Sequence, residues 1–237
     1  MLNAVLAGKK RGTGLEGLRL RIGVAEGAED VVTATVFERL AYLPDELFCA
    51  VFAELLDMPF GPLREISYWP SWYLSNGSRV EPDVFLGDDQ QHLLVEAKRH
   101  DNTRQQCAEQ LAAELEAGWR SGQLAENCIL LTLGGFGELR EHTRQSLYQD
   151  IAAALPVGRS FHFRLVCRSW QQLYVALENQ LRRVALAQPG LQRLLTDIAD
   201  CYSWHGLRTH RLRWLSGLST QGSITVPPGA FDHWSLK

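Results

Sequence analysis

Residues 79–98 read RVEPDVFLGDDQQHLLVEAK and give the clearest indication of the fold. It contains an apolar-rich run at residues 80–86 and a second at residues 93–95. Between them lies the turn signal Gly87-Asp88-Asp89. Two short apolar runs separated by a Gly/Asp turn predict a β-hairpin, so we expect two paired strands here.

Three charged residues interrupt this predicted hairpin. Asp83 falls in its first strand, and Glu96 and Lys98 come at the end of its second strand. Residues two apart in a strand share a face, so Glu96 and Lys98 should lie together, with Asp83 across the hairpin. Two carboxylates beside one ammonium are suited to a hard divalent cation and a developing anion. The alternative is an edge hairpin with a solvated Glu96–Lys98 ion pair.

The order Glu81-Pro82-Asp83, twelve further residues, then Glu96-Ala97-Lys98 resembles the motif of the PD-(D/E)XK nuclease superfamily. The resemblance covers roughly residues 29–133 and implies the restriction-endonuclease-like fold. It implies Asp83 and Glu96 as ligands of Mg²⁺ or Mn²⁺, with the backbone carbonyl of Ala97 as a third oxygen. It also places Lys98 beside the water that attacks phosphorus.

Accessory residues of the family suggest further candidates. Members often add an acid from the first helix, and Glu29 is the candidate here, with Glu38 as the alternative. Glu29 could equally be a carboxylate that stabilises a helix N-terminus. Some members carry a glutamine on the helix after the Glu-x-Lys motif, and Gln106 and Gln110 are spaced i, i+4 there. Both could instead be surface glutamines.

The order of the expected elements predicts an α/β fold with an αβββαβ core, a mixed sheet flanked by helices, and extra C-terminal helices. The resemblance implies the same core, that of the restriction-endonuclease-like fold. The expected domains are a flexible N-terminal arm at 1–22, a nuclease-like domain at 23–200 and a C-terminal extension at 201–237 packed on the core. Asp101 or Thr103 is expected to cap the helix that ends near Trp119. Helices are expected at 29–43, 45–56, about 103–119, 138–155, 170–187 and 191–202, and strands at 63–74, in the hairpin, at 128–133 and at 161–167.

Composition limits the class of protein. The chain has 237 residues, 46% of them hydrophobic, which is enough for a sizeable core. Its five cysteines are scattered without a Cys-x-x-Cys pair, which argues against a disulfide framework or a zinc knuckle. We expect reduced, buried thiols in a cytoplasmic protein. No signal peptide or membrane-spanning run is evident.

Charge is unevenly distributed. The formal net charge is −3, yet residues 159–213 carry nine arginines against three acids. These arginines could form a basic groove or lie on separate solvated helix faces. Near the C-terminus Arg208, Arg211 and Arg213 alternate with aromatic residues, so they are candidates to bind substrate phosphates. Packing on the core, or contact with a partner protein, is the alternative.

These observations favour a Mg²⁺-dependent nuclease that hydrolyses DNA, in a setting such as bacterial defence or DNA repair. RNA as the substrate, and a homodimer or a partner protein, remain open. The alternative is a catalytically weak module of the same fold that binds nucleic acid or a partner within a larger complex. A purely structural subunit is a third possibility.

Overall fold

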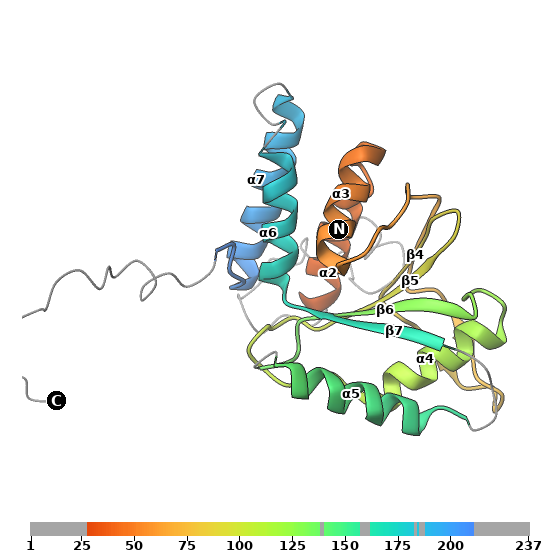
Figure 1. The fold of residues 1–237 in the computed structure, drawn as a ribbon. Coiled ribbons are helices and arrows are strands. Elements are labelled where there is room, and N and C mark those ends of the chain that lie inside the picture. The colour runs from red at the N-terminus through yellow and green to blue at the C-terminus, as the bar shows by residue number, and fades with distance from the viewer. Residues whose placement is uncertain (1–27, 138–139, 157–161, 183, 185–187, 211–237) are drawn as a thin grey trace, which may run out of the picture.

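The computed structural model describes residues 28–137, 140–156, 162–182, 184 and 188–210. Helices lie on both faces of one central sheet (Figure 1). The elements in chain order are α2 (Ala28–Leu40), α3 (Asp45–Leu56), β1 (Glu65–Tyr68), β2 (Trp72–Tyr73), β3 (Arg79–Val80), β4 (Val84–Gly87), β5 (His92–Ala97), α4 (Ala108–Arg120), β6 (Asn127–Leu133), α5 (Glu141–Ala154), β7 (His162–Arg168), α6 (Trp170–Leu181) and α7 (Pro189–His205).

The central sheet has five strands in the order β1-β4-β5-β6-β7. β1, β4 and β5 pair antiparallel, whereas β5, β6 and β7 run parallel. The parallel strand β6 is almost wholly apolar and buried, as expected for a strand covered by helices on both faces. The predicted mixed sheet flanked by helices is therefore confirmed.

The two faces of the sheet carry separate cores. α2, α3, α6 and α7 pack on one face, and α4 and α5 pack on the other (Figure 1). Alternation along β5 explains the division: Val95 and Ala97 belong to the first core, while Leu94 belongs to the second. Glu96 therefore faces the α4 side at the carboxyl end of its strand.

The expected strand over residues 63–74 is wrong in one respect. The chain forms β1 up to Tyr68, breaks, and then forms β2, which pairs with β3 in a separate two-stranded ribbon. Trp69 has a positive φ of 48° and is followed by Pro70, which cannot donate to a sheet ladder. This break turns the Trp69 side chain inward, where it is buried.

The predicted start of the fourth helix is also wrong. α4 begins at Ala108, so neither Asp101 nor Thr103 caps it. Asp101 instead accepts hydrogen bonds from the backbone N–H groups of Trp170 at 2.8 Å and Gln171 at 3.3 Å. It therefore stabilises the start of α6, together with the capping box of Ser169.

The structure also bears on the expected termini, cysteines and membrane spans. Residues 1–22 lie outside the described part of the chain, and so do residues 211–237. α7 continues across residue 200 to His205. The five cysteines are free thiols, but only Cys128 and Cys167 are buried; Cys49 and Cys201 are half-buried and Cys107 is exposed. Of the helices that the structure describes, none combines the length and apolar character that a membrane crossing needs.

Candidate functional site

The site forms where the hairpin meets the carboxyl end of β5. Asp83 directly precedes β4, and the antiparallel register pairs the next residue, Val84, with Val95. Asp83 therefore lies beside the end of β5, where its Oδ2 accepts a hydrogen bond of 2.8 Å from the backbone N–H of Ala97. The hairpin thus sets the position of the buried Asp83 carboxylate, as the sequence predicts.

Glu96 and Lys98 lie on one side of the same strand end. The Lys98 Nζ is 2.5 Å from the Oε1 of Glu96, and the Glu96 side chain is only 3% exposed. The other carboxylate oxygen, Oε2, is buried and has no hydrogen-bond partner among the described residues. An unpaired buried carboxylate oxygen is costly, so this atom is suited to bind a cation.

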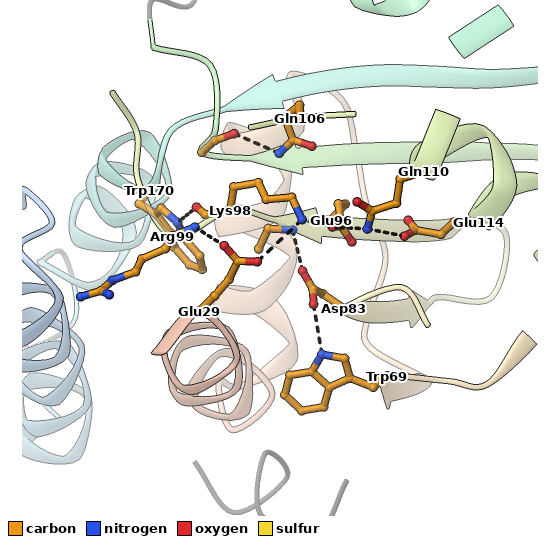
Figure 2. Close-up of polar contacts among 12 residues, drawn as sticks. Glu29, Trp69, Asp83, Glu96, Lys98, Arg99, Gln106, Gln110, Glu114 and Trp170 are labelled. Atoms are coloured by element: carbon orange, nitrogen blue, oxygen red, sulfur yellow. Dashed lines mark hydrogen bonds and ion pairs between the residues drawn. The ribbon is translucent and has the colours of Figure 1, made fainter. Parts of the chain in front are cut away.

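The first turn of α2 brings Glu29 to the same place (Figure 2). Its Oε2 accepts a hydrogen bond of 2.8 Å from the backbone N–H of Arg99, and its Oε1 is 3.7 Å from the Lys98 Nζ. Glu38 lies nine residues further along α2, or about 13 Å by the rise of an α-helix. Glu29 is therefore the first-helix acid that joins the carboxylate–lysine cluster of Glu29, Asp83, Glu96 and Lys98.

A second acid reaches Glu96 through a glutamine. The Gln110 Nε2 donates to the Oε1 of Glu96 at 2.7 Å and to the Oε1 of Glu114 at 2.9 Å. Gln110 and Glu114 are one turn apart on α4, so they present one polar stripe to the cluster (Figure 2). Glu114 is buried, with its Oε2 unpartnered among the described residues.

Trp69 fixes the other side of Asp83. Its indole Nε1 donates a hydrogen bond of 3.0 Å to the Oδ1 of Asp83. Both Asp83 oxygens therefore accept a hydrogen bond from the protein, one from Trp69 and one from Ala97. Each carboxylate oxygen has a second lone pair, so Asp83 keeps the capacity to bind a cation.

A glycine turn after β6 packs directly on Lys98. Gly134 and Gly135 have φ values of 70° and 76°. A Cβ at Gly134 would lie 2.4 Å from the Lys98 carbonyl oxygen, and a Cβ at Gly135 would lie 2.8 Å from the Lys98 Cβ. Only glycine fits both the backbone conformation and this close approach. The turn therefore restricts where the Lys98 side chain can go.

The acids of the site are hard to ionise. Burial, followed by the charge of Glu96, raises the pKa of Asp83 well above its ordinary value. Burial and the charge of Glu114 raise the pKa of Glu96 to about 8. Burial raises the pKa of Glu114 to about 7. A nearby divalent cation would favour the charged forms of all three acids.

Lys98 behaves differently from the acids. Burial alone would lower the pKa of Lys98, but the charge of Glu96 and its hydrogen bond outweigh burial and raise it. Lys98 is therefore protonated at neutral pH. In this arrangement it can place a positive charge or donate a proton.

The donor atoms at the site are oxygens, which Mg²⁺ and Mn²⁺ prefer. Asp83 and Glu96 offer carboxylate oxygens, and one buried Glu96 oxygen has no partner in the described part of the chain. In the part of the chain that is described, no three His, Cys, Asp or Glu side chains gather into a metal site by themselves. Mg²⁺ typically uses one or two carboxylates and completes its coordination with water and substrate phosphate. The arrangement is compatible with that mode of binding.

The other candidates are not gathered at the cluster. Gln106 precedes α4, so the predicted helical pair with Gln110 is wrong. Its Nε2 instead donates to the Gly134 carbonyl at 3.0 Å and braces the glycine turn. Arg208 is exposed and lies away from the cluster. Burial raises the pKa of Asp101, and the positive charge of Arg208 partly opposes this rise. Arg211 and Arg213 lie outside the described residues.

Two residues of the site were not predicted. Glu114 stands between Leu111 and Leu115 on the apolar face of α4, and a carboxylate in such a stripe is a detectable signal. Trp69 carries no comparable signal, because its role depends on the break after β1. Arg99 follows Lys98 in sequence, but its guanidinium points away from Asp83 and Glu96 (Figure 2).

The fold and site define a mixed α/β protein with a buried carboxylate–lysine cluster at the end of its central hairpin. No family model matches the chain. A protein of Pasteurella multocida (strain Pm70), described as "Uncharacterized protein PM0110", is 40% identical over 231 residues, which cover 95% of this chain and 88% of that protein. The chain belongs to the same protein family as this relative.

Proposed function

We propose that this protein is a Mg²⁺-dependent nuclease of the PD-(D/E)XK type, with a restriction-endonuclease-like core, that hydrolyses phosphodiester bonds in DNA. The observation that carries the proposal is the convergence of Asp83, Glu96 and Lys98 at one strand end, in the order that the motif requires. An acid from the first helix, Glu29, joins them.

Asp83, Glu96 and the Ala97 carbonyl would hold the cation. When bound, the cation supplies positive charge to the phosphate during attack by water. The free Oε2 of Glu96 supports this assignment, because the proposed ligand is the one oxygen of Glu96 that no described residue satisfies. The hydrogen bonds from Trp69 and Ala97 hold the Asp83 carboxylate in a fixed orientation.

Lys98 would stabilise negative charge as the water attacks phosphorus. Its raised pKa keeps it protonated, and its contact with Glu96 holds its ammonium at the cation site. Glu29 lies 3.7 Å from that ammonium and would orient it together with a water molecule. Attack by water forms one P–O bond to phosphorus and breaks the bond to the departing oxygen; the attacking water releases a proton to solvent, and the departing oxygen takes a proton from solvent.

The test is cleavage of plasmid, linear duplex and single-stranded DNA by the full chain, with Mg²⁺, with Mn²⁺ and with chelator. Cleavage that needs the cation and is lost in Glu96→Ala supports the proposal. Nucleic-acid binding without cleavage in any cation would favour the alternative, a nuclease-fold module that only binds. A parallel assay on RNA decides which nucleic acid is the substrate.

A further inference from the structure

The open edge of the sheet carries a basic groove that the carboxylate–lysine cluster does not use. β7 is the last strand of the sheet, and no strand among the described residues pairs with its outer side. A pocket of about 690 Å³ runs along this edge. We call it the edge groove; its basic and aromatic lining consists of Arg140, Arg144, Tyr148, Phe163, Arg164 and Arg168.

The groove straddles the edge of the sheet. Arg164 and Arg168 come from one face of β7, beside the end of α3, while Phe163 packs on the opposite face, toward α5. Arg144 and Tyr148 come from α5 and are one turn apart. Figure 1 shows α5 on one side of β7 and α3 on the other.

The charge of the groove is positive. Its lining contains four arginines but only two acids, Asp57 and Glu141, which leaves two positive charges in excess. Arg168 is the most fixed arginine, because it contacts both Asp57 and the Leu55 carbonyl. Arg144 and Arg164 are the more available ones. Arg144 pairs with an exposed Glu141 on the surface, and Arg164 reaches backbone carbonyls only at 3.5 Å. Exposed ion pairs contribute little, so phosphate can replace Glu141 readily.

An aromatic platform accompanies the arginines. Tyr148 is 43% exposed and stacks on Phe163 with a ring-centroid distance of 4.9 Å. A ring that is backed by a second ring and open to solvent can stack on a nucleobase. A basic groove with an exposed aromatic side chain is the combination that binds single-stranded nucleic acid without sequence preference.

The groove also has a defined relation to the carboxylate–lysine cluster. In the parallel register Arg168 pairs with Leu133, and Leu133 pairs with Ala97. Arg168 is therefore level with Ala97 and two strands away, or about 10 Å by the spacing of strands in a sheet. One nucleic-acid strand could run along β7 and reach the cluster at the carboxyl ends of the strands.

From these observations we infer that the edge groove binds a single-stranded segment of nucleic acid, with phosphates on Arg144 and Arg164 and a base stacked on Tyr148. This inference extends the proposed nuclease function, and it rests on that proposal because the proposal identifies nucleic acid as the substrate. It names the part of the substrate that lies outside the cleavage site.

The experiment measures binding of a labelled single-stranded oligonucleotide to the full chain by fluorescence anisotropy, in chelator and over a series of salt concentrations. Each lost phosphate contact reduces the slope of log affinity against log salt by about 0.7 for a single strand. Arg144→Ala combined with Arg164→Ala should therefore flatten the slope by about 1.4. Tyr148→Ala should weaken binding about fivefold or more, whereas Tyr148→Phe keeps the ring and should bind like the wild type.

Arg182→Ala is the matched control, because Arg182 is a 72% exposed arginine at the far end of α6. It should change neither affinity nor slope, and melting temperatures should establish that all variants fold. An unchanged slope in the double arginine variant overturns the inference, as does equal binding by Tyr148→Ala and Tyr148→Phe. Failure of the nuclease proposal would look different. If the double arginine variant flattens the salt dependence of binding but the wild type never cleaves DNA, the nuclease proposal is refuted and the binding role of the edge groove is still supported.

Discussion

The Lys98 ammonium lies 2.5 Å from the Oε1 of Glu96 and 3.7 Å from the Oε1 of Glu29, so two acids from different elements hold this one ammonium group. Glu96 comes from β5 and Glu29 from α2. The ion pair leaves the second Glu96 oxygen buried and unpaired among the described residues. In this geometry Lys98 and a divalent cation can share one carboxylate without competing for the same atom.

The first prediction concerns the charge of Lys98. Lys98→Met keeps the length of the side chain but removes the ammonium that would stabilise the attacked phosphate. The cleavage rate should fall on the order of a hundredfold to a thousandfold, as it does when one donor to a developing anion is removed. Single-turnover rates at saturating Mg²⁺ measure this loss. Wild-type rates in Lys98→Met would remove the lysine from the mechanism.

The second prediction separates Glu29 from Glu38 on α2. Glu29→Gln should cut about ten to a hundred times more slowly yet still respond to Mg²⁺, because Glu29 orients the ammonium rather than holding the cation. Glu38→Gln is the matched control on the same helix, and its cleavage rate should stay at the wild-type level. Equal losses in the two variants would mean that α2 has been disturbed as a whole.

The third prediction is a dependence of stability on pH through Glu114. Burial raises the pKa of Glu114 from 4.5 to about 7, so the folded state holds this proton more tightly than the unfolded state. The stability that the protonated group contributes is therefore present below about pH 4.5 and is lost as the pH rises through about 7. Glu114→Gln cannot ionise and keeps an oxygen that can accept from Gln110.

Thermal unfolding in chelator tests whether the stability of the wild type falls, relative to Glu114→Gln, as the pH rises. The melting temperature of Glu114→Gln should rise relative to the wild type between about pH 5 and pH 8, with a difference in unfolding free energy of at most a few kcal/mol. A difference between the two proteins that stays constant over this range would contradict a buried, proton-holding Glu114.

The fourth prediction uses two glycines of the same backbone conformation. Gly135 has a φ of 76° and Gly122 a φ of 70°, but only Gly135 has atoms where a Cβ would go. Gly122→Ala should cost about 1 to 2 kcal/mol of stability, the strain of a left-handed residue, with no change in cleavage. Gly135→Ala adds an overlap with the Lys98 side chain and should also reduce the cleavage rate. Equal activities of the two variants would show that the turn does not position Lys98.

The hairpin, the mixed sheet and the flanking helices could be predicted because local signals determine them. The turn at Gly87–Asp89 and the apolar runs around it specify the pairing of β4 and β5. The i, i+2 spacing of Glu96 and Lys98 then places both side chains together. At the break between β1 and β2 the sequence predicts only a bulge or an edge position at Pro70, because the run of aromatic residues, including Trp69, has high strand propensity throughout.

Contacts between distant segments could not be read from local patterns. The sequence predicts that Asp101 caps the helix that follows it, whereas Asp101 accepts hydrogen bonds at the start of α6, about 70 residues later. Gln110 and Glu114 join the site only because α4 packs on the face of the sheet to which Glu96 points. Glu29 was named from the resemblance, and its position depends on how α2 docks against the strand ends.

The nuclease proposal can be tested by measuring cleavage of DNA by the wild type and by Glu96→Ala, each with Mg²⁺ and with excess chelator. The alanine variant removes the motif carboxylate whose Oε2 is buried without a partner among the described residues, and Glu65→Ala, at an exposed acid on β1, is the control. We expect cleavage by the wild type and the control in Mg²⁺ only, and a loss on the order of a thousandfold or more in Glu96→Ala. Undiminished cleavage by Glu96→Ala, or by the wild type in chelator, would contradict it.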